Sequence, residues 1–301
     1  MLGFLPYPLI GFISFLLLII NILLTACILF PATLIKICLP FKWSNLLLTR
    51  LLNKIANDWV YRNNLAIAFT RKINWHVTGL SGIDPDGKYL LISNHQSWVD
   101  IVVLQKVFHG YIPFIKFFLK KELLWVPIMG PAWWALDFPF MKRYSKEFLA
   151  KHPHLKGKDI EITRKACEKF RLLPVTVMNF LEGTRLTPEK KERQNSPYRH
   201  LLKPKSGGMG FVLSAMGDQL TGILDTTIVY PKGSVNFWPF LCGLVRDIWV
   251  DVRLIPLSDE LKGDYIEDSA YQERFQGWVN SLWKEKDDRI DEIKKSIGIN
   301  D

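Results

Sequence analysis

The chain has 301 residues, of which 49% are hydrophobic, and its formal net charge is +10 at pH 7. This length accommodates one large domain and an appendage. Nucleic-acid binding would explain the basic character, but the chain contains no nucleic-acid-binding motif, and this class does not account for an apolar N-terminus. The four cysteines have no close spacing, so disulfides and a zinc site are not expected, which suits a reducing compartment.

The N-terminal segment has no charged side chain from residue 1 to residue 35. It is longer than the ~20 residues that span a bilayer. A buried helix of a soluble protein is the alternative, but such a helix normally carries a polar stripe, and this segment is uniformly apolar. We expect residues 1–35 to be inserted in a membrane, either as one span or as a helical hairpin that turns near Asn21.

A tetrapeptide inside this segment raises a second interpretation. Leu24-Thr25-Ala26-Cys27 resembles the cleavage box of a bacterial lipoprotein, which would make the segment a signal peptide. However, the basic start of a signal peptide is missing, and the apolar run continues after the cysteine, where a polar mature sequence normally begins. A retained anchor is therefore the favoured interpretation.

Basic residues follow the apolar segment directly. Between residues 36 and 76 there are seven basic residues and one acidic residue, a net charge of +6. They are Lys36, Lys42, Arg50, Lys54, Arg62, Arg71 and Lys72, against Asp58. Such charges beside a span favour the cytoplasmic side and attract anionic headgroups. We expect residues 36–70 to form a basic amphipathic helix at the membrane interface, with the rest of the chain in the cytoplasm, at the inner membrane if the source is a bacterium.

Strand-like and helix-like segments alternate over residues 71–301, without an internal repeat. Strands are expected at 74–77, 89–93, 111–115, 136–141, 175–180, 226–230 and 248–255. Helices are expected at 98–107, 160–170, 209–216 and 271–284. This alternation predicts an α/β domain with a mainly parallel central sheet flanked by helices. In such a fold, ligands bind at the carboxyl ends of the strands.

One polar cluster, Asn94-His95-Gln96-Ser97-Trp98-Val99-Asp100, follows the buried strand expected at 89–93. Across a strand-to-helix junction, Asp100 in the first turn of the helix can reach back to the imidazole of His95. Such a hydrogen bond fixes the tautomer and leaves the other ring nitrogen free as a general base for a hydroxyl group. Asn94 and Ser97 are expected to shape the turn or cap the helix. Ser97 as a nucleophile is the alternative, although no Gly-x-Ser-x-Gly elbow is present.

A second motif, Phe180-Leu181-Glu182-Gly183-Thr184-Arg185, lies at the end of another expected strand. The pattern His-x4-Asp, led by asparagine and followed by Glu-Gly-Thr-Arg in this order, resembles the glycerolipid acyltransferases, and in particular the 1-acylglycerol-3-phosphate acyltransferase superfamily. The likeness covers about residues 70–232. His-x4-Asp alone is a weak signal, and the second motif makes the pattern specific.

The resemblance implies the glycerolipid acyltransferase fold, preceded by an N-terminal membrane-anchoring helical segment. It implies that His95 is the catalytic base and that Asp100 orients it. It also places Glu182 to Arg185 at the substrate, with Arg185 and Arg143 as phosphate ligands and Lys121 as a weaker candidate. Acyl-CoA or acyl-carrier protein would be the co-substrate, with no cofactor and no metal. A thioester already carries a good leaving group, so a covalent enzyme intermediate is unnecessary.

The implied activity is transfer of a fatty acyl group to a lysophospholipid hydroxyl, most simply from lysophosphatidate to phosphatidate. The segment 138–143 departs from the family pattern, because the glycine that normally opens this block is absent ahead of Leu136. This form is more similar to acyltransferases that remodel larger lysophospholipids, which is the first alternative. The second is a non-catalytic lipid-binding membrane protein of the same fold, against which the intact His95 and Asp100 argue.

The segment 123–141 is nearly uncharged and has two interpretations. It is long enough for a second membrane span, but Asp137 and three prolines weaken that interpretation, and the family likeness places it in the catalytic domain. Trp125, Trp133 and Trp134 would then form an apolar floor for an acyl chain or contact the membrane interface.

Overall fold

The computed structural model describes residues 2–39, 41–141, 165, 167–170 and 173–299. Its centre is a six-stranded sheet in the order β1-β8-β7-β2-β6-β3. Neighbouring strands are parallel except β7 and β8, which are antiparallel. The mainly parallel α/β fold predicted from the sequence is confirmed. The strands are β1 (Asn74–Thr78), β2 (Tyr89–Ser93), β3 (Ile115–Phe117), β6 (Thr176–Phe180), β7 (Gly222–Val229) and β8 (Asp247–Ile255).

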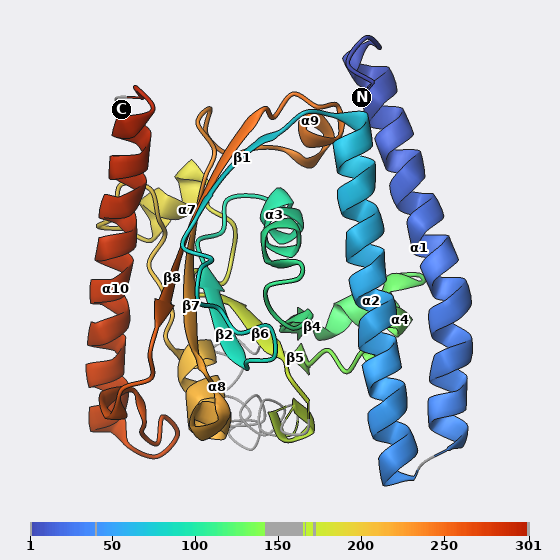
Figure 1. Ribbon diagram of the computed structural model, residues 1–301. Helices are drawn as coiled ribbons and strands as arrows, with labels where there is room; N and C mark the ends of the chain where they lie inside the picture. The colour runs from blue at the N-terminus through green and yellow to red at the C-terminus, as the bar shows by residue number, and fades with distance from the viewer. Residues whose placement is uncertain (1, 40, 142–164, 166, 171–172, 300–301) are drawn as a thin grey trace.

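Helices cover both faces of this sheet. The longer ones are α1 (Tyr7–Cys38), α2 (Lys42–Thr70), α3 (Val99–Phe108), α8 (Gly207–Met216) and α10 (Ser269–Ser296). α3 lies between the sheet and the α1–α2 pair, whereas α8 and α10 lie on the opposite face (Figure 1). Successive side chains of β2 alternate between the two layers: Leu91 joins the core of α2 and α3, and Leu90 and Ile92 join the core of α8 and α10. Every residue of β2 is therefore buried, as expected for a strand covered on both faces.

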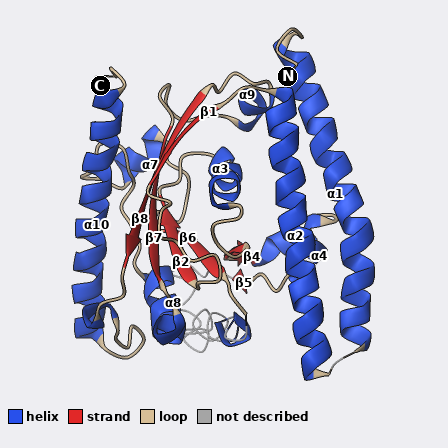
Figure 2. Ribbon diagram, viewed as in Figure 1, coloured by secondary structure: helices blue, strands red, loops and turns tan. Residues whose placement is uncertain are grey.

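α1 and α2 form an antiparallel pair beside the sheet (Figure 2). α1 continues through Asn21 without a turn, and the buried Asn21 amide donates to the carbonyl of Trp59 (3.0 Å) and to Oδ1 of Asn63 (2.7 Å) on α2. The alternative of a hairpin turning near Asn21 is wrong, because this polar residue is used in packing against α2. Among the described residues, α1 is the one helix that is long and apolar enough to cross a membrane.

The segment between β3 and residue 141 consists of short elements. Its elements are β4 (Leu119–Lys120), a 3-10 helix (Lys121–Trp125), α4 (Met129–Ala135) and β5 (Phe140–Met141), which pairs with β4. Over these described residues no helix approaches spanning length, so the alternative of a second span at 123–141 is wrong. The strand expected at 136–141 is reduced to its last two residues. An ion pair of 2.9 Å between Asp137 and Lys36 joins this segment to α1.

Other boundaries differ from the prediction for local reasons. The strand expected at 111–115 begins only at Ile115, after Pro113, which has no backbone N–H for a ladder. β7 begins at Gly222, four residues before the predicted start at 226. The prediction started too late because Asp225 is charged, but in the structure this carboxylate lies within the strand and forms an ion pair of 2.6 Å with Lys286. The helix expected at 160–170 lies largely outside the described residues.

The C-terminal helix α10 continues twelve residues beyond its predicted end at 284 and reaches Ser296. Its buried stripe persists through Lys286, Ile290 and Ile293, but a fully buried lysine is not recognised as part of an apolar stripe. The remaining short helices are α7 (Pro188–Arg193), α9 (Phe237–Leu241) and the 3-10 turns Gly217–Gln219 and Asp259–Leu261.

Candidate active site

His95 and Asp100 lie at the junction between β2 and α3. Asp100, in the first turn of α3, reaches back so that its Oδ2 lies 2.9 Å from Nδ1 of His95. The same oxygen accepts the backbone N–H groups of Gln96 (2.6 Å) and Ser97 (2.8 Å). Asp100 is fully buried, whereas the imidazole is 13% exposed. A carboxylate that accepts from Nδ1–H leaves Nε2 unprotonated and available as a base.

The two sequence motifs meet because β2 and β6 are parallel neighbours. Ser93, the last residue of β2, pairs with Phe180, the last residue of β6, so both strands end at the same edge of the sheet. The Phe180 ring stacks on the imidazole of His95, with ring centroids 3.8 Å apart and an interplanar angle of 13°. This contact holds the imidazole flat against the second motif.

Glu182 supports the backbone of the first motif. Its Oε1 accepts the N–H of His95 (2.8 Å), and its Oε2 accepts the N–H of Leu202 (3.1 Å). The carboxyl group is buried, and burial raises the pKa of Glu182 to about 8. Sequence analysis placed Glu182 at the substrate, but in the structure it does not line the cavity described below. Its contacts instead fix the position of His95.

Gly183, Thr184 and Arg185 form the turn after β6. The φ angle of Gly183 is +67°, a left-handed conformation that glycine adopts without strain. Thr184 accepts a hydrogen bond from Nζ of Lys190 (2.8 Å). The guanidinium of Arg185 lies 4.8 Å from the ring centre of Trp98, and among the described residues no carboxylate forms an ion pair with it. Arg185 is therefore a positioned cation whose charge is open to a ligand.

A cavity of about 550 Å³ lies beside the imidazole. His95 and all three residues of this turn line it, and the remaining lining is mainly apolar. That apolar lining comes from α1, α2, α3, the segment 114–138 and β6. Trp133 lines the cavity, whereas Trp125 and Trp134 do not and are 83% and 54% exposed. Of the three tryptophans considered as an acyl floor, the structure brings only Trp133 to the site.

The family model described as Acyltransferase matches residues 74–232, which include both motifs and more than half of the chain. The chain belongs to the acyltransferase family. It is 25% identical over 228 residues to lysocardiolipin acyltransferase 1 of Gallus gallus, a match that covers 71% of this chain and 56% of that relative. It is 27% identical over 241 residues to 1-acyl-sn-glycerol-3-phosphate acyltransferase gamma of Mus musculus, covering 74% and 58%. The match thus spans little more than half the length of these relatives.

The fold has a solved counterpart. The crystal structure of the 1-acyl-sn-glycerophosphate (LPA) acyltransferase PlsC from Thermotoga maritima superposes with a TM-score of 0.57, covering 94% of this chain and 95% of that chain. The sequence identity is 14%, so this similarity concerns the fold. The fold class predicted from the sequence and the family resemblance are both confirmed.

One predicted substrate ligand, Lys121, is not among the described residues that line the cavity. Lys121 opens the 3-10 helix and does not line the cavity, whereas the preceding Lys120 does. Side chains alternate in direction along an extended segment, so the choice within a lysine pair depends on a register that the sequence alone does not reveal. Arg143 lies outside the described residues.

Asn94 and Ser97 shape the loop that carries the base. The Asn94 side chain forms two 2.9 Å hydrogen bonds with the backbone of Ile228, one as donor and one as acceptor. The Ser97 hydroxyl donates to the carbonyl of Val235 and accepts the N–H of Val99 (3.0 Å). Because this hydroxyl is engaged with backbone rather than with His95, the geometry gives no support to Ser97 as a nucleophile.

Sequence analysis missed Tyr230. Its hydroxyl donates to Oδ1 of Asp100 at 2.7 Å, and the side chain is 2% exposed. The residue falls at the end of an expected strand, where an aromatic side chain is read as core. The available signal was its position: the strand end beside a proline lies at the same sheet edge as the other two motifs.

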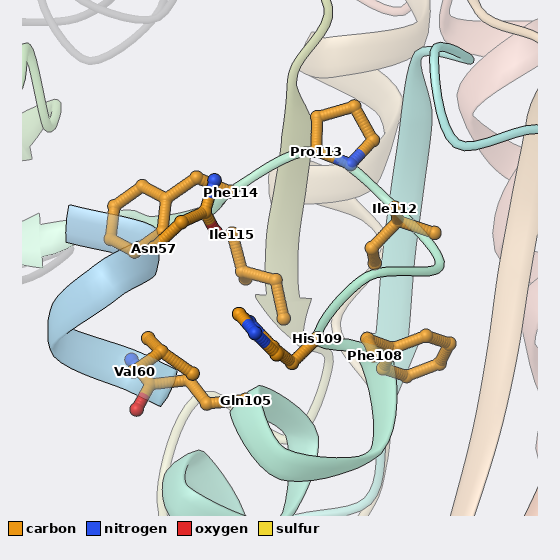
Figure 3. A pocket seen from close by; sticks show the side chains of 9 residues that line it. All are labelled: Asn57, Val60, Gln105, Phe108, His109, Ile112, Pro113, Phe114 and Ile115. Carbon is orange, nitrogen blue, oxygen red and sulfur yellow. The ribbon is translucent and has the colours of Figure 1, made fainter. Parts of the chain in front are cut away.

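A second cavity, of about 10 Å³, lies between α2 and the end of α3. Figure 3 shows the imidazole of His109 within it, near Asn57 and Val60 of α2. The volume suits a single water molecule. Neither His95 nor Arg185 lines it, so this space is separate from the acyltransferase site.

Proposed function

We propose that this acyltransferase transfers a fatty acyl group from acyl-CoA or acyl-carrier protein to the hydroxyl of a lysophospholipid, with lysophosphatidate as the leading acceptor. The observation that carries the proposal is that His95, which is paired with Asp100, and the cation Arg185 line one mainly apolar cavity of about 550 Å³. Drug-sized ligands and lipids occupy pockets of ~300–1,000 Å³ lined by apolar side chains and a few polar groups. The volume and lining suit an acyl chain.

In the proposed reaction, Nε2 of His95 takes the proton of the acceptor hydroxyl as its oxygen attacks the thioester carbonyl carbon. The new C–O bond gives a tetrahedral oxyanion, which collapses with cleavage of the C–S bond. The thiolate leaves and takes the proton from the imidazolium. Asp100 stays ionised and stabilises the imidazolium during this cycle. Atoms and charge balance without a covalent enzyme intermediate.

Arg185 is proposed to hold the acceptor phosphate. A guanidinium offers a planar fork of donors that matches phosphate oxygens, and its stacking on Trp98 orients the fork. Lys120, which lines the same cavity, supplies a second positive charge, and Arg143 is kept as a further candidate from the sequence motif. Gly183 and Thr184 bring backbone close to the ligand.

A remodelling activity toward another lysophospholipid is the second candidate. Two observations favour it: the form of the segment 138–143 and the similarity to a lysocardiolipin acyltransferase. A panel of lysophosphatidate, lysophosphatidylglycerol and lysocardiolipin, each with acyl-CoA and with acyl-carrier protein, distinguishes the candidates. Preference for lysophosphatidate supports the leading proposal, preference for another acceptor supports the second, and no transfer to any acceptor contradicts both.

The α1–α2 pair is proposed to be the membrane attachment, with residues 1–35 as anchor, 36–70 at the interface and 71–301 as the cytoplasmic catalytic domain. Large apolar side chains are exposed along α1 and on the outer face of α2, where no protein covers them. Examples are Phe12, Phe15, Leu16, Leu24, Trp43 and Leu47. A continuous apolar surface of this kind normally marks a membrane or a protein interface.

The attachment is tested with the full-length protein in washed membranes. We expect it to stay in the membrane fraction in high salt and in carbonate, because an apolar contact is not screened by ions. Release by high salt alone would contradict the apolar anchor and leave only electrostatic binding through the basic residues. A labelled cysteine near the C-terminus reports which side of the membrane the catalytic domain faces.

A further inference from the structure

The two oxygens of Asp100 have unequal surroundings. Oδ2 accepts from Nδ1 of His95 and from two backbone N–H groups, those of Gln96 and Ser97. Oδ1 accepts from the Tyr230 hydroxyl at 2.7 Å, which is its one donor among the described residues. Asp100 has no exposed surface, so no solvent replaces a lost donor there. The phenol is what satisfies the second oxygen.

Tyr230 is held firmly in place. It directly follows β7 and precedes Pro231, and its carbonyl closes a turn with the N–H of Gly233 (3.0 Å). Its ring belongs to the same core as Val99 and Val103 of α3. Because the backbone on both sides is constrained, the hydroxyl presents a fixed donor to the carboxylate rather than a mobile one.

We propose that Tyr230 is a positioning residue for acyl transfer, whose hydroxyl locks the Asp100 carboxylate in the orientation that keeps Oδ2 on Nδ1 of His95. This inference rests on the proposed function and names a third member of its catalytic apparatus. The contacts run from Tyr230, at the end of β7, through Asp100 to the base His95. Residues at the ends of β2, β6 and β7 therefore all contribute to the position of this base.

Two consequences follow from the loss of this hydroxyl. First, a buried Oδ1 without a donor drives the carboxylate to rotate in search of one, which disturbs the alignment of the imidazole. Second, a carboxylate that has turned away from Nδ1 no longer fixes the proton on that nitrogen, so the ring can adopt the other tautomer.

The charged and titratable groups around this carboxylate are few. His95 contacts it, Tyr230 contacts it, and Glu182 interacts with it through space. Burial and the neighbouring carboxylate raise the pKa of Tyr230 well above its ordinary value, so the phenol remains a donor throughout the pH range of an assay. A substitution at Tyr230 leaves Glu182 in place, so Glu182 has the same effect in the wild type and in Tyr230→Phe.

A purely structural role for the ring is the competing explanation. Tyr230→Phe keeps the ring and removes only the hydroxyl, which separates the two. Tyr271→Phe is the matched control, because Tyr271 is also buried and its hydroxyl also donates a single 2.7 Å hydrogen bond, to Leu261 in the other core. Both variants lose one buried phenol hydrogen bond, and only one loses it at Asp100.

The experiment compares the full-length wild type, Tyr230→Phe and Tyr271→Phe in acyl transfer and in thermal unfolding. We expect Tyr230→Phe to lower kcat by about tenfold with little change in either KM. Tyr271→Phe should lower the Tm comparably while kcat stays at the wild-type value. Equal kinetics in wild type and Tyr230→Phe, or equal losses in both variants, would overturn the proposal.

A spectroscopic measurement keeps this inference separate from the proposed function. In protein labelled with ¹⁵N-histidine, the ring signals of His95 are assigned by comparison with His95→Gln. We expect the Nδ1–H tautomer in the wild type and a second tautomer or averaged signals in Tyr230→Phe. Unchanged signals would refute the positioning role. If the wild type transfers no acyl group to any acceptor, the proposed function fails, and the tautomer measurement still decides the role of Tyr230.

Discussion

The cavity has two kinds of wall, and they are built differently. At the catalytic corner His95 lines the cavity, and Asp100 and Glu182 support it from outside the lining. The buried carboxyl oxygens of these two residues all accept hydrogen bonds, and four of these bonds come from backbone N–H groups. The α1–α2 wall is apolar on both sides: Ala26 faces the cavity, while Phe12 and Leu16 are 58% and 47% exposed on the outside. The corner is completed by hydrogen bonds within the protein, whereas the outer surface of the wall is apolar and exposed, which fits the proposed membrane attachment.

The largest expected effect comes from breaking the corner. His95→Ala should lower kcat by ~10²–10⁴-fold, because a general base is lost, while the Tm and the membrane association stay near wild type. Asp100→Asn should cause a comparable loss through a misoriented or wrongly protonated ring. Steady-state kinetics of the purified variants check this. Near-normal turnover in either variant would contradict the assignment of His95 as the general base.

The next largest effect is expected at Arg185, at the polar end of the cavity. Arg185→Ala should raise the acceptor KM by roughly 30-fold and leave the donor KM nearly unchanged, because charged hydrogen bonds to a phosphate are lost. Arg185→Lys keeps the charge without the fork and should be intermediate. Arg193→Ala, an exposed cation on the nearby α7, is the matched control. A raised donor KM with an unchanged acceptor KM would assign Arg185 to the donor instead.

The third effect concerns the apolar wall alone. Ala26→Leu places three more carbons in the cavity and should shift the preference toward shorter acyl chains by about tenfold in relative kcat/KM, since methylene-sized mismatches in apolar pockets have effects of this order. Cys27→Leu adds a bulky side chain at the neighbouring, exposed position and should leave the preference unchanged. Competition between acyl donors of different length measures the shift. The same shift in both variants would argue against an acyl chain beside α1.

The smallest effect is a pH dependence of stability at the corner. Burial raises the pKa of Glu182 to about 8 in the folded protein from its ordinary value of 4.5, so the folded state binds more protons between these values. The free energy of unfolding should therefore fall as pH rises from 4.5 to 8. Glu182→Gln removes this dependence and also loses one acceptor, so the Tm difference between wild type and variant should be largest near pH 5 and smaller near pH 7.5.

The buried Lys116 of β3 also has a shifted pKa, but it titrates in a higher pH window. Burial lowers the pKa of Lys116 from 10.5 to about 8, so its contribution to stability rises with pH between these values. Measurements between pH 5 and 7.5 lie below this window, so the titration of Lys116 does not affect the comparison. A Tm difference that is constant with pH would show that Glu182 does not titrate in this range.

The catalytic corner and the α1–α2 wall differ in how much of their structure could be predicted from the sequence. The β2–β6 edge followed from two local patterns, each a buried strand ending in a polar cluster, and from the general rule that parallel strands end together. His95 and Asp100 were found in this way, whereas the residues 183–185 were assigned to the substrate through the family resemblance. The roles of Glu182 and Tyr230 were not predicted, because their partners are a backbone N–H and a carboxylate from other strands. Such contacts depend on register and leave no local pattern.

The α1–α2 wall was recognised by composition but not by its packing. Uniform apolarity predicts a long helix but not which side of it packs against the protein. A turn near Asn21 therefore stayed open as an alternative to a single span, and the contact with Asn63 was not foreseen. The segment 119–141 was harder still, because its conformation depends on pairing between β4 and β5 and on the Asp137–Lys36 ion pair. In both cases the deciding interaction joins residues that are distant in the sequence.

The α1–α2 wall also has a thermodynamic consequence. If the helices that bound the acyl cavity are embedded in lipid, as proposed, a bilayer of a different thickness changes their tilt at a cost of fractions of a kcal/mol per Å of mismatch. That free energy acts directly on the space beside Ala26 and Ala56. Chain-length selectivity is then a joint property of the enzyme and its host membrane, and the lipids that the enzyme makes feed back on its own choice of substrate.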